Sequence, residues 1–384
     1  MKIVYIVSSL RQAGPVNVLY NIVSNLIGEG QHEIHIIKLS EDEAGRSITG
    51  RFESMGIKVW PLHYSKLKLE ICIAKVSREV GEILDEIKPD IVHTHGYHSV
   101  LSVCNNSKWN RVETLHCIHW EYFLMSKGKL LGSWMCHRYG NAIRKMDALV
   151  AISQAVKTAY LNRGFCGENL FVACNGCDTH KFFPLPETEK IEMRRKLGIP
   201  VDKRVFVVVG TLSMLKDPLT VIRAFKRIPK DLAELLFIGK GELKDACQKE
   251  ADGADNIQFC GYKMDAQHYL QAADYSICAS HSEGFGLNFA ESLLCGVPVV
   301  GTNIPPFREF TSFSPEIRTL EFTPGDVDAL QKSLERACEE DIEMGSISRE
   351  FANIYSAENM AKTYEHIYNE LLKRKSNSGR TDII

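Results

Sequence analysis

Apolar and polar residues alternate along the chain in blocks that predict strands and helices in turn. Short continuous apolar runs predict buried strands in the first half at Ile3–Val7, Ile34–Lys38, Ile57–Trp60, Ile91–His93, Val112–Leu115, Ala148–Ile152 and Leu170–Cys174. Apolar positions at helical spacing lie between several of these runs, most clearly at Val16–Leu26, Ile73–Ile87 and Leu130–Met146. Buried strands separated by helices are typical of a parallel sheet covered on both faces.

The second half repeats this organisation after a break rich in proline. Its strand-like runs are Val205–Val209, Leu235–Ile238, Ile257–Phe259, Tyr275–Ala279 and Val297–Gly301. Pro184 and Pro186 interrupt regular structure, and the helical stretch Thr188–Leu197 follows them. We therefore predict an α/β protein with one doubly wound domain over residues 1–183 and another over residues 184–355. A last helix is predicted after Ser356 within residues 356–384, and it ends in a frayed polar tail.

Composition and charge exclude several classes of protein. Hydrophobic residues make up 45% of the chain and charged residues 24%, as in ordinary globular proteins. Because 46 Lys and Arg face 48 Asp and Glu, no basic excess is available to bind nucleic acid. The apolar start is short for an export signal and is interpreted as a first strand, and no apolar run approaches a membrane span. We therefore expect a cytoplasmic protein with reduced cysteines.

The strongest chemical pattern lies between Ser280 and Gly296. A predicted strand runs into the turn Glu283-Gly284-Phe285-Gly286, and a helix that carries Glu291 is predicted to begin near Leu287. Glycines let the backbone approach a ligand, and a helix N-terminus attracts a diphosphate. The two carboxylates can then accept hydrogen bonds from sugar and ribose hydroxyls. The alternative is an ordinary strand–turn–helix with two solvated glutamates.

This stretch resembles the motif of the family 4 glycosyltransferases, a retaining class with the GT-B fold of two Rossmann-like domains that face a central cleft. The family has a Glu, seven residues and a second Glu, followed by a segment like EAxAxGxPV; this chain has EGFGLNFAE followed by SLLCGVPV. The resemblance implies that Glu283 contacts the donor sugar, Glu291 the nucleotide ribose, and the backbone near Gly286 and Leu287 the diphosphate. It also implies that the C-terminal helix returns to the first domain.

Further stretches extend the resemblance over most of the chain. In VVVGTLSMLKDPLTVIRAF, Lys216 matches the family lysine that neutralises the donor diphosphate, whereas Thr211 replaces a common arginine. Gly239 begins a G-x-G loop similar to one that lines the nucleotide, and Gly14 matches a glycine-rich loop under the diphosphate. By spacing alone, Lys216 is more typical of an exposed loop lysine, and the G-x-G loop is a weak signal that also fits a simple strand–helix turn. The loop with Gly14 fits a plain strand–helix turn equally well. The donor-binding residues implied together are Gly14, Thr211, Lys216, Gly239, Glu283, Gly284, Phe285, Gly286, Leu287 and Glu291.

Three histidines are candidates on the acceptor side. His93 and His95 lie two apart in a segment that resembles the family's H-x-H, so in a regular strand they share a face. If the strand ends between them, one is buried and the other reaches the cleft. His116 matches a T-x-H motif, which implies contact with the donor sugar near the reacting carbon or with the acceptor. No metal-binding spacing is present, and we expect no metal and no cofactor.

Residues 122–146 combine aromatic and aliphatic side chains with several lysines and arginines. Such a segment can form a surface that contacts a membrane peripherally, as in related enzymes that extend lipid-linked glycans. The alternative is a helix that packs its apolar residues inward and solvates its charges.

The resemblance thus implies a retaining hexosyltransferase, with His116, Lys216 and Glu283 as its catalytic residues. It would move a sugar from a nucleotide-diphosphate donor, expected to be a UDP-sugar, to a glycan or lipid-linked glycan during synthesis of a surface polysaccharide such as O-antigen, capsule or exopolysaccharide. Two alternatives stay open. A nucleotide-sugar 2-epimerase of the same fold would change the donor itself, and a noncatalytic nucleotide-sugar-binding protein would show no turnover.

Overall fold

The computed structural model describes residues 1–28, 30, 32–43, 45–313, 315–318 and 320–378, and the chain divides into two compact units. The first unit comprises Met1–Gly176 and Ala357–Ile384, and the second comprises Cys177–Ser356. The boundary lies before the predicted one at residues 183 and 184. Residues between the two positions are held by the second unit, because Cys177 donates its backbone N–H to Tyr355 and Phe183 accepts a hydrogen bond from Gln271.

The first unit is built on a seven-stranded parallel sheet in the order β3-β2-β1-β4-β5-β6-β7. Its strands are β1 (Lys2–Val7), β2 (Glu33–Ser40), β3 (Lys58–Tyr64), β4 (Ile91–His95), β5 (Asn110–Leu115), β6 (Ala148–Ala151) and β7 (Leu170–Val172). All seven predicted strands are present. The central strands are buried on both faces, which explains why they are continuous apolar runs rather than alternating ones.

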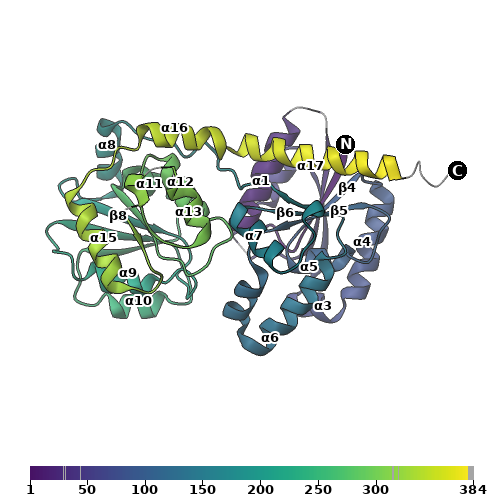
Figure 1. Cartoon of the computed structure of the whole chain (residues 1–384), viewed down its shortest axis with the longest axis horizontal. Coiled ribbons are helices and arrows are strands. Elements are labelled where there is room, and N and C mark those ends of the chain that lie inside the picture. The colour runs from purple at the N-terminus through teal and green to yellow at the C-terminus, as the bar shows by residue number, and fades with distance from the viewer. Residues whose placement is uncertain (29, 31, 44, 314, 319, 379–384) are drawn as a thin grey trace. The chain divides into compact units, whose positions relative to one another are not determined.

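Helices cover both faces of this sheet (Figure 1). They are α1 (Gly14–Ile27), α2 (Thr49–Glu53), α3 (Lys66–Ile71), α4 (Ile73–Ile87), α5 (Tyr97–Val103), α6 (His119–Ile143), α7 (Gln154–Asn162) and α17 (Ala357–Ser378), with a 3-10 turn, η1 (Gly167–Asn169). The C-terminal helix α17, yellow in Figure 1, packs beside α1 in this unit. Residues 376–378 of the predicted tail belong to α17, and residues 379–384 lie outside the described part of the chain.

Helix α6 differs from its prediction, since it begins at His119 rather than near Leu130. Gly128 has non-helical φ and ψ of 74° and 176°, so the helix folds back as two arms. The arms pack closely, because a Cβ on Gly132 would lie 2.5 Å from the carbonyl oxygen of Phe123. None of the helices in the described ranges is long and apolar enough to cross a membrane.

The second unit repeats the architecture with a six-stranded parallel sheet in the order β10-β9-β8-β11-β12-β13. Its strands are β8 (Arg204–Val209), β9 (Ala233–Ile238), β10 (Ile257–Gly261), β11 (Tyr275–Cys278), β12 (Val299–Thr302) and β13 (Glu321–Phe322). The sequence did not predict β13, since two residues are too few for a periodic pattern. The helices are α8 (Glu187–Leu197), α9 (Pro218–Phe225), α10 (Lys244–Glu250), α11 (Ala266–Ala272), α12 (Leu287–Leu294), α13 (Pro305–Thr311), α14 (Pro315–Arg318), α15 (Val327–Glu339) and α16 (Gly345–Ile354).

Strand order reverses once in each sheet, between β1 and β4 and between β8 and β11. In doubly wound sheets, ligands bind outside the carboxyl ends of the strands at such a reversal, because the loops there diverge. The loops after β1 and β4 carry Gly14 and Gly96, and the loops after β8 and β11 carry Lys216 and Glu283. Both Rossmann-like units therefore present candidate residues at the topologically expected edge.

Candidate functional site

Lys216 and Glu283 form an ion pair at the carboxyl edge of the second unit. The ammonium contacts Oε1 of Glu283, and Ser280 donates its hydroxyl to the same oxygen at 2.8 Å. Burial alone lowers the pKa of Lys216, but the Glu283 carboxylate raises it overall, so the ammonium stays charged. The sequence suggested both charged residues. It did not reveal Ser280, which lies three positions before Glu283.

The two loops that carry this pair are bound to each other. His281 donates its backbone N–H to the carbonyl of Leu215 at 2.9 Å, and its Nε2 lies 3.1 Å from Oδ2 of Asp217. Asp217 also caps α9 by accepting the backbone N–H of Thr220. Both sides of the ion pair are therefore fixed by the fold, and little reorganisation is needed to present it to a ligand.

A tight turn links Glu283 to helix α12. Gly286, the residue before the helix, has φ of 97°, and a Cβ there would lie 2.3 Å from the ring of Phe307. Glycine is therefore required for both conformation and space. The side chain of Phe285 is 2% exposed and packs edge-on against Phe310, so only its backbone can meet a ligand. Leu287 begins α12 and brings the N-terminus of the helix to this edge.

Glu291 lies one turn into α12 and is half-buried. Burial raises the pKa of its carboxyl to about 7, although the nearby charges of Lys181 and Lys216 oppose the shift. Lys216 therefore influences both glutamates of the sequence motif. A carboxyl with this pKa changes charge near neutral pH, and its hydrogen bonding to a hydroxyl changes with it.

Thr211 and Gly239 belong to two loops in direct contact. A Cβ on Gly239 would lie 1.7 Å from the carbonyl oxygen of Gly210, and one on Gly241 would lie 2.0 Å from that of Leu212. Only glycine permits this approach, so the G-x-G pattern has a packing reason. Thr211 is exposed at the edge, as expected for a position that could meet a ligand.

In the first unit, Gly14 begins α1 immediately after the loop from β1. The preceding residue, Ala13, has no side chain that can cap the helix, and a proline lies in the first turn. Pro15 has no backbone N–H, and Val16 donates its own to the carbonyl of Ala13 at 3.0 Å, so the first turn leaves the N–H of Gly14 for a ligand. This geometry fits the predicted site and also fits an ordinary strand–helix turn.

The three candidate histidines have different surroundings. His93 is fully buried, with Nδ1 2.7 Å from the Tyr368 hydroxyl and Nε2 2.8 Å from the Thr114 hydroxyl. It has no face for an acceptor, and we leave it out of the proposed site. The suggestion that the strand ends between His93 and His95 is wrong, because β4 continues to His95.

His95 and His116 are brought together at the ends of β4 and β5. Nδ1 of His95 lies 2.8 Å from Nε2 of His116, and burial lowers the pKa of His116 to about 4. His116 is half-buried and follows the last residue of β5, whereas His95 is 7% exposed. His116 is therefore the histidine best placed to contact a ligand, in the neutral form. Among the described residues, no three His, Cys, Asp or Glu side chains are grouped to hold a metal ion.

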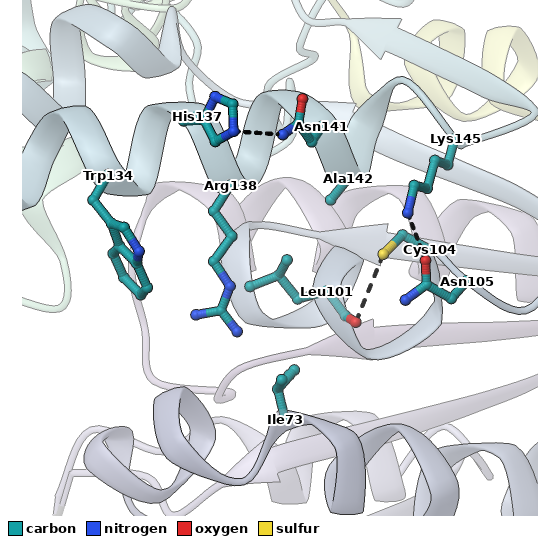
Figure 2. Close-up of a pocket in the computed structure, with 10 residues that line it drawn as sticks. All are labelled: Ile73, Leu101, Cys104, Asn105, Trp134, His137, Arg138, Asn141, Ala142 and Lys145. Carbon is teal, nitrogen blue, oxygen red and sulfur yellow. Dashed lines mark hydrogen bonds between the residues drawn. The ribbon is translucent and has the colours of Figure 1, made fainter.

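A surface groove of about 330 Å³ lies elsewhere on the first unit, between α4, α5 and α6 (Figure 2). Trp134 and Arg138 line one side of it, and Ile73 lies opposite in the same view. None of the site residues named above lines this groove. The part of α6 that lines it is the arm after Gly128.

Part of the basic and aromatic segment is exposed to solvent. Large apolar side chains of α6 are in contact with solvent, and we call this set the α6 surface: Tyr122, Leu124, Met125, Leu130, Leu131 and Trp134. Leu130 is 91% exposed, and Lys127 and Lys129 flank the bend on either side of Gly128. Phe123 and Met135 are buried, so only part of the segment follows the inward-packing alternative.

Comparisons with known proteins agree with this architecture. Residues 13–181 match the family described as Glycosyltransferase Family 4, and residues 189–353 match the one described as Glycosyl transferases group 1. The O-antigen biosynthesis glycosyltransferase WclY of Escherichia coli is 23% identical over 389 residues, covering 97% of this chain and 99% of that protein.

Solved structures with the GT-B fold superpose on nearly the whole chain. Sucrose-phosphate synthase from Thermosynechococcus elongatus gives a TM-score of 0.82 at 18% identity, covering 97% of this chain and 100% of that one. HepE from Anabaena, solved in complex with UDP and glucose, gives a TM-score of 0.77 at 18% identity, covering 96% and 99%. The chain belongs to the glycosyltransferases of the GT-B fold, with a family 4 domain followed by a group 1 domain.

Proposed function

We propose that this glycosyltransferase is a retaining hexosyltransferase that uses a nucleotide-diphosphate sugar, with a UDP-sugar as the first choice. Its acceptor would be a hydroxyl of a glycan or lipid-linked glycan during synthesis of a cell-surface polysaccharide. The observation that carries the proposal is the Lys216–Glu283 pair at the strand-order reversal of the second unit, beside the N-terminus of α12. Similarity to an O-antigen enzyme and to a structure with UDP bound supports the choice of acceptor and donor.

The donor would bind along the edge of the second unit. Lys216 and the backbone of the Gly284–Leu287 turn face the diphosphate, Glu283 accepts hydrogen bonds from the sugar, and Glu291 accepts them from the ribose. Thr211 and Gly239 line the same edge. Negative charge grows on the diphosphate as the glycosidic bond breaks, so a fixed ammonium stabilises the transition state more than the ground state.

The chemistry would need no protein nucleophile. The bond from the anomeric carbon to the leaving phosphate breaks while the acceptor oxygen bonds on the same face, and the leaving phosphate takes the acceptor proton. Neutral His116 would donate a hydrogen bond to the transferred sugar or the acceptor. Lys216 and the helix N-terminus offset the leaving charge, so the proposal includes no metal and no cofactor.

We also propose that the protein acts at the cytoplasmic side of the membrane and contacts it through the α6 surface. Leucines, a tryptophan and lysines at the bend of α6 are the composition that favours the interface between lipid headgroups and acyl chains. Such contact would bring the enzyme to a lipid-linked acceptor.

A screen of UDP-, GDP- and ADP-sugars for thermal stabilisation and for donor turnover tests the proposal. We expect one nucleotide class to stabilise the protein and to give a glycosidic product whose anomeric configuration matches the donor, as determined by NMR. Conversion of the donor to its 2-epimer without a glycosidic product would favour the epimerase. Binding without turnover for any acceptor would favour the noncatalytic alternative, and an inverted product would contradict the retaining mechanism.

A further inference from the structure

His95 lies at the end of β4, and the reaction described above leaves it without a defined role. Its ring is nearly fully buried, with 7% exposure. Nδ1 lies 2.8 Å from Nε2 of His116, and the centroids of the two rings are 5.0 Å apart. The other nitrogen of His95, Nε2, is buried and has no hydrogen-bond partner among the described residues.

The single proton between the two rings determines the tautomer of both. If His116 donates, then neutral His95 must carry its own proton on Nε2, where a buried N–H finds no acceptor. If His95 donates from Nδ1, its Nε2 is a bare lone pair, and neutral His116 carries its proton on Nδ1. Buried N–H groups without an acceptor are rarer in proteins than incompletely satisfied acceptors. The second arrangement is therefore favoured.

Protonation of either ring to imidazolium is opposed by the surroundings. Burial lowers the pKa of His95, and the neighbouring rings of His93 and His116 lower it further. Burial also lowers the pKa of His116 to about 4. Both rings are neutral near pH 7, so the tautomer argument applies to the working enzyme.

A second histidine packs against the ring of His95. His93 lies 4.4 Å from it, centroid to centroid, and is itself fixed by hydrogen bonds to Tyr368 and Thr114. A donor held this firmly can orient its partner, as second-layer groups orient histidines in other active sites. His116 is only half-buried, and its Nδ1 lies across the ring from the nitrogen that meets His95.

We infer that His95 is a positioning residue, whose Nδ1–H holds His116 as the neutral tautomer with its own N–H at Nδ1, ready to donate to an oxygen of the sugar or acceptor. This role rests on the proposed contact between His116 and substrate. His95 itself contacts no substrate and takes no proton during the reaction.

Two substitutions of His95 separate positioning from packing. His95→Asn keeps an N–H donor close to the position of Nδ1, whereas His95→Leu removes the donor and retains a side chain of similar size. Ring-nitrogen chemical shifts of isotope-labelled histidine, assigned with His116→Gln, report the tautomer without substrate. The wild type, His95→Asn and His95→Leu are then assayed for kcat and KM with the donor found in the screen. His119→Asn is the control, because His119 is a buried histidine that bonds to Tyr160 instead.

We expect His116 to carry its proton on Nδ1 in the wild type, in His95→Asn and in the control. In His95→Leu we expect mixed tautomers and a kcat at least ~10-fold lower, with little change in the donor KM, because the lost interaction acts on the reacting state. Either a wild-type His116 protonated on Nε2 or an unchanged kcat in His95→Leu overturns the inference. Failure of the proposed function looks different: the wild type forms no glycosidic product, while the tautomer of His116 is still measured.

Discussion

The hydroxyl of Tyr368 lies 2.7 Å from Nδ1 of His93, although the two residues are 275 positions apart in the chain. The same hydroxyl lies 3.1 Å from that of Tyr5, and the hydroxyl of Tyr364 lies 2.9 Å from Oγ1 of Thr114. All these groups are buried. Helix α17 is therefore attached to β1, β4 and β5 by polar as well as apolar contacts, immediately behind His95.

Removal of the Tyr368 hydroxyl is expected to destabilise the first unit. In Tyr368→Phe, Nδ1 of His93 stays buried without a partner, so the free energy of unfolding should fall by ~1–3 kcal/mol. Urea denaturation measures this change. Tyr122→Phe, at a residue 43% exposed, is the control and should change stability by no more than about 0.5 kcal/mol. Equal effects of the two substitutions would show that the buried network contributes no more than a surface hydroxyl.

The Lys216–Glu283 pair gives a prediction for turnover. Lys216→Ala and Glu283→Ala should each lower kcat/KM at least ~10-fold, the scale of losing one electrostatic contact to the transition state. Steady-state assays with the identified donor measure this, and circular dichroism checks the fold. Lys249→Ala removes an exposed lysine from α10 of the same unit and should leave the rate unchanged. Wild-type rates in both site variants would refute their assignment.

Much of the fold could be predicted because it depends on local pattern. The run Ile3–Val7 is apolar throughout, and this alone identifies a strand buried on both faces. The two-residue strand β13 has no such pattern, and its pairing with β12 is a tertiary event. Gly128 is one glycine in a helical segment, and a single glycine does not reveal that α6 folds back there.

The sequence suggested residues for the candidate site but not which of them pair in the structure. The spacing of Glu283 and Glu291 identified both carboxylates, yet Glu283 meets Lys216 across 67 positions of sequence. The spacing of His93 and His95 could not show which ring is fully enclosed, since that depends on tyrosines of α17 more than 250 positions away. Long-range packing decides both questions.

Glu291 should make nucleotide binding depend on pH. Burial raises the pKa of its carboxyl to about 7, so the carboxylate that we propose accepts ribose hydroxyls forms only as the pH rises through that value. Hydrogen bonds to charged groups exceed neutral ones by ~1 kcal/mol, and the carboxyl is ~10% ionised at about pH 6 and ~90% ionised at about pH 8, so the Kd for UDP should be roughly 4-fold larger at the lower pH. Calorimetric titration measures it. Glu291→Gln controls for ionisation of UDP itself, and an identical pH dependence in this variant would contradict the role of the carboxyl.

Glu113 should make the free energy of unfolding fall as the pH rises. It is fully buried on β5 and bonds to Tyr139, Thr94 and the backbone N–H of Gly96. Burial raises its pKa from 4.5 to about 8, against the effect of these hydrogen bonds. The folded protein thus keeps a proton that the unfolded chain releases, and stability falls as the pH rises between these values, by at most ~1.4 kcal/mol per pH unit from this group.

Replacement of Glu113 by glutamine should remove that dependence. The amide can donate to Thr94 and accept from Tyr139, as the protonated acid does, so the fold should tolerate it. We expect the stability of Glu113→Gln relative to wild type to rise between about pH 5 and about pH 8, as followed by urea denaturation. Glu339→Gln, at an exposed position on α15, should run parallel to wild type. A parallel curve for Glu113→Gln would show that the carboxyl is already ionised in the folded protein.

Exposure of the α6 surface predicts binding to lipid. The protein should co-sediment with vesicles of phosphatidylcholine and anionic phosphatidylglycerol. It should co-sediment less with pure phosphatidylcholine, because Lys127 and Lys129 lie beside the apolar residues and attract anionic lipid. Leu131→Glu should weaken binding at least ~10-fold, since it removes one inserted side chain and adds repulsion from anionic lipid. Leu232→Glu is a matched control, because Leu131 and Leu232 are both 51% exposed but Leu232 lies in the second unit. If both substitutions reduced sedimentation equally, or if the wild type did not sediment, α6 would not be the membrane contact.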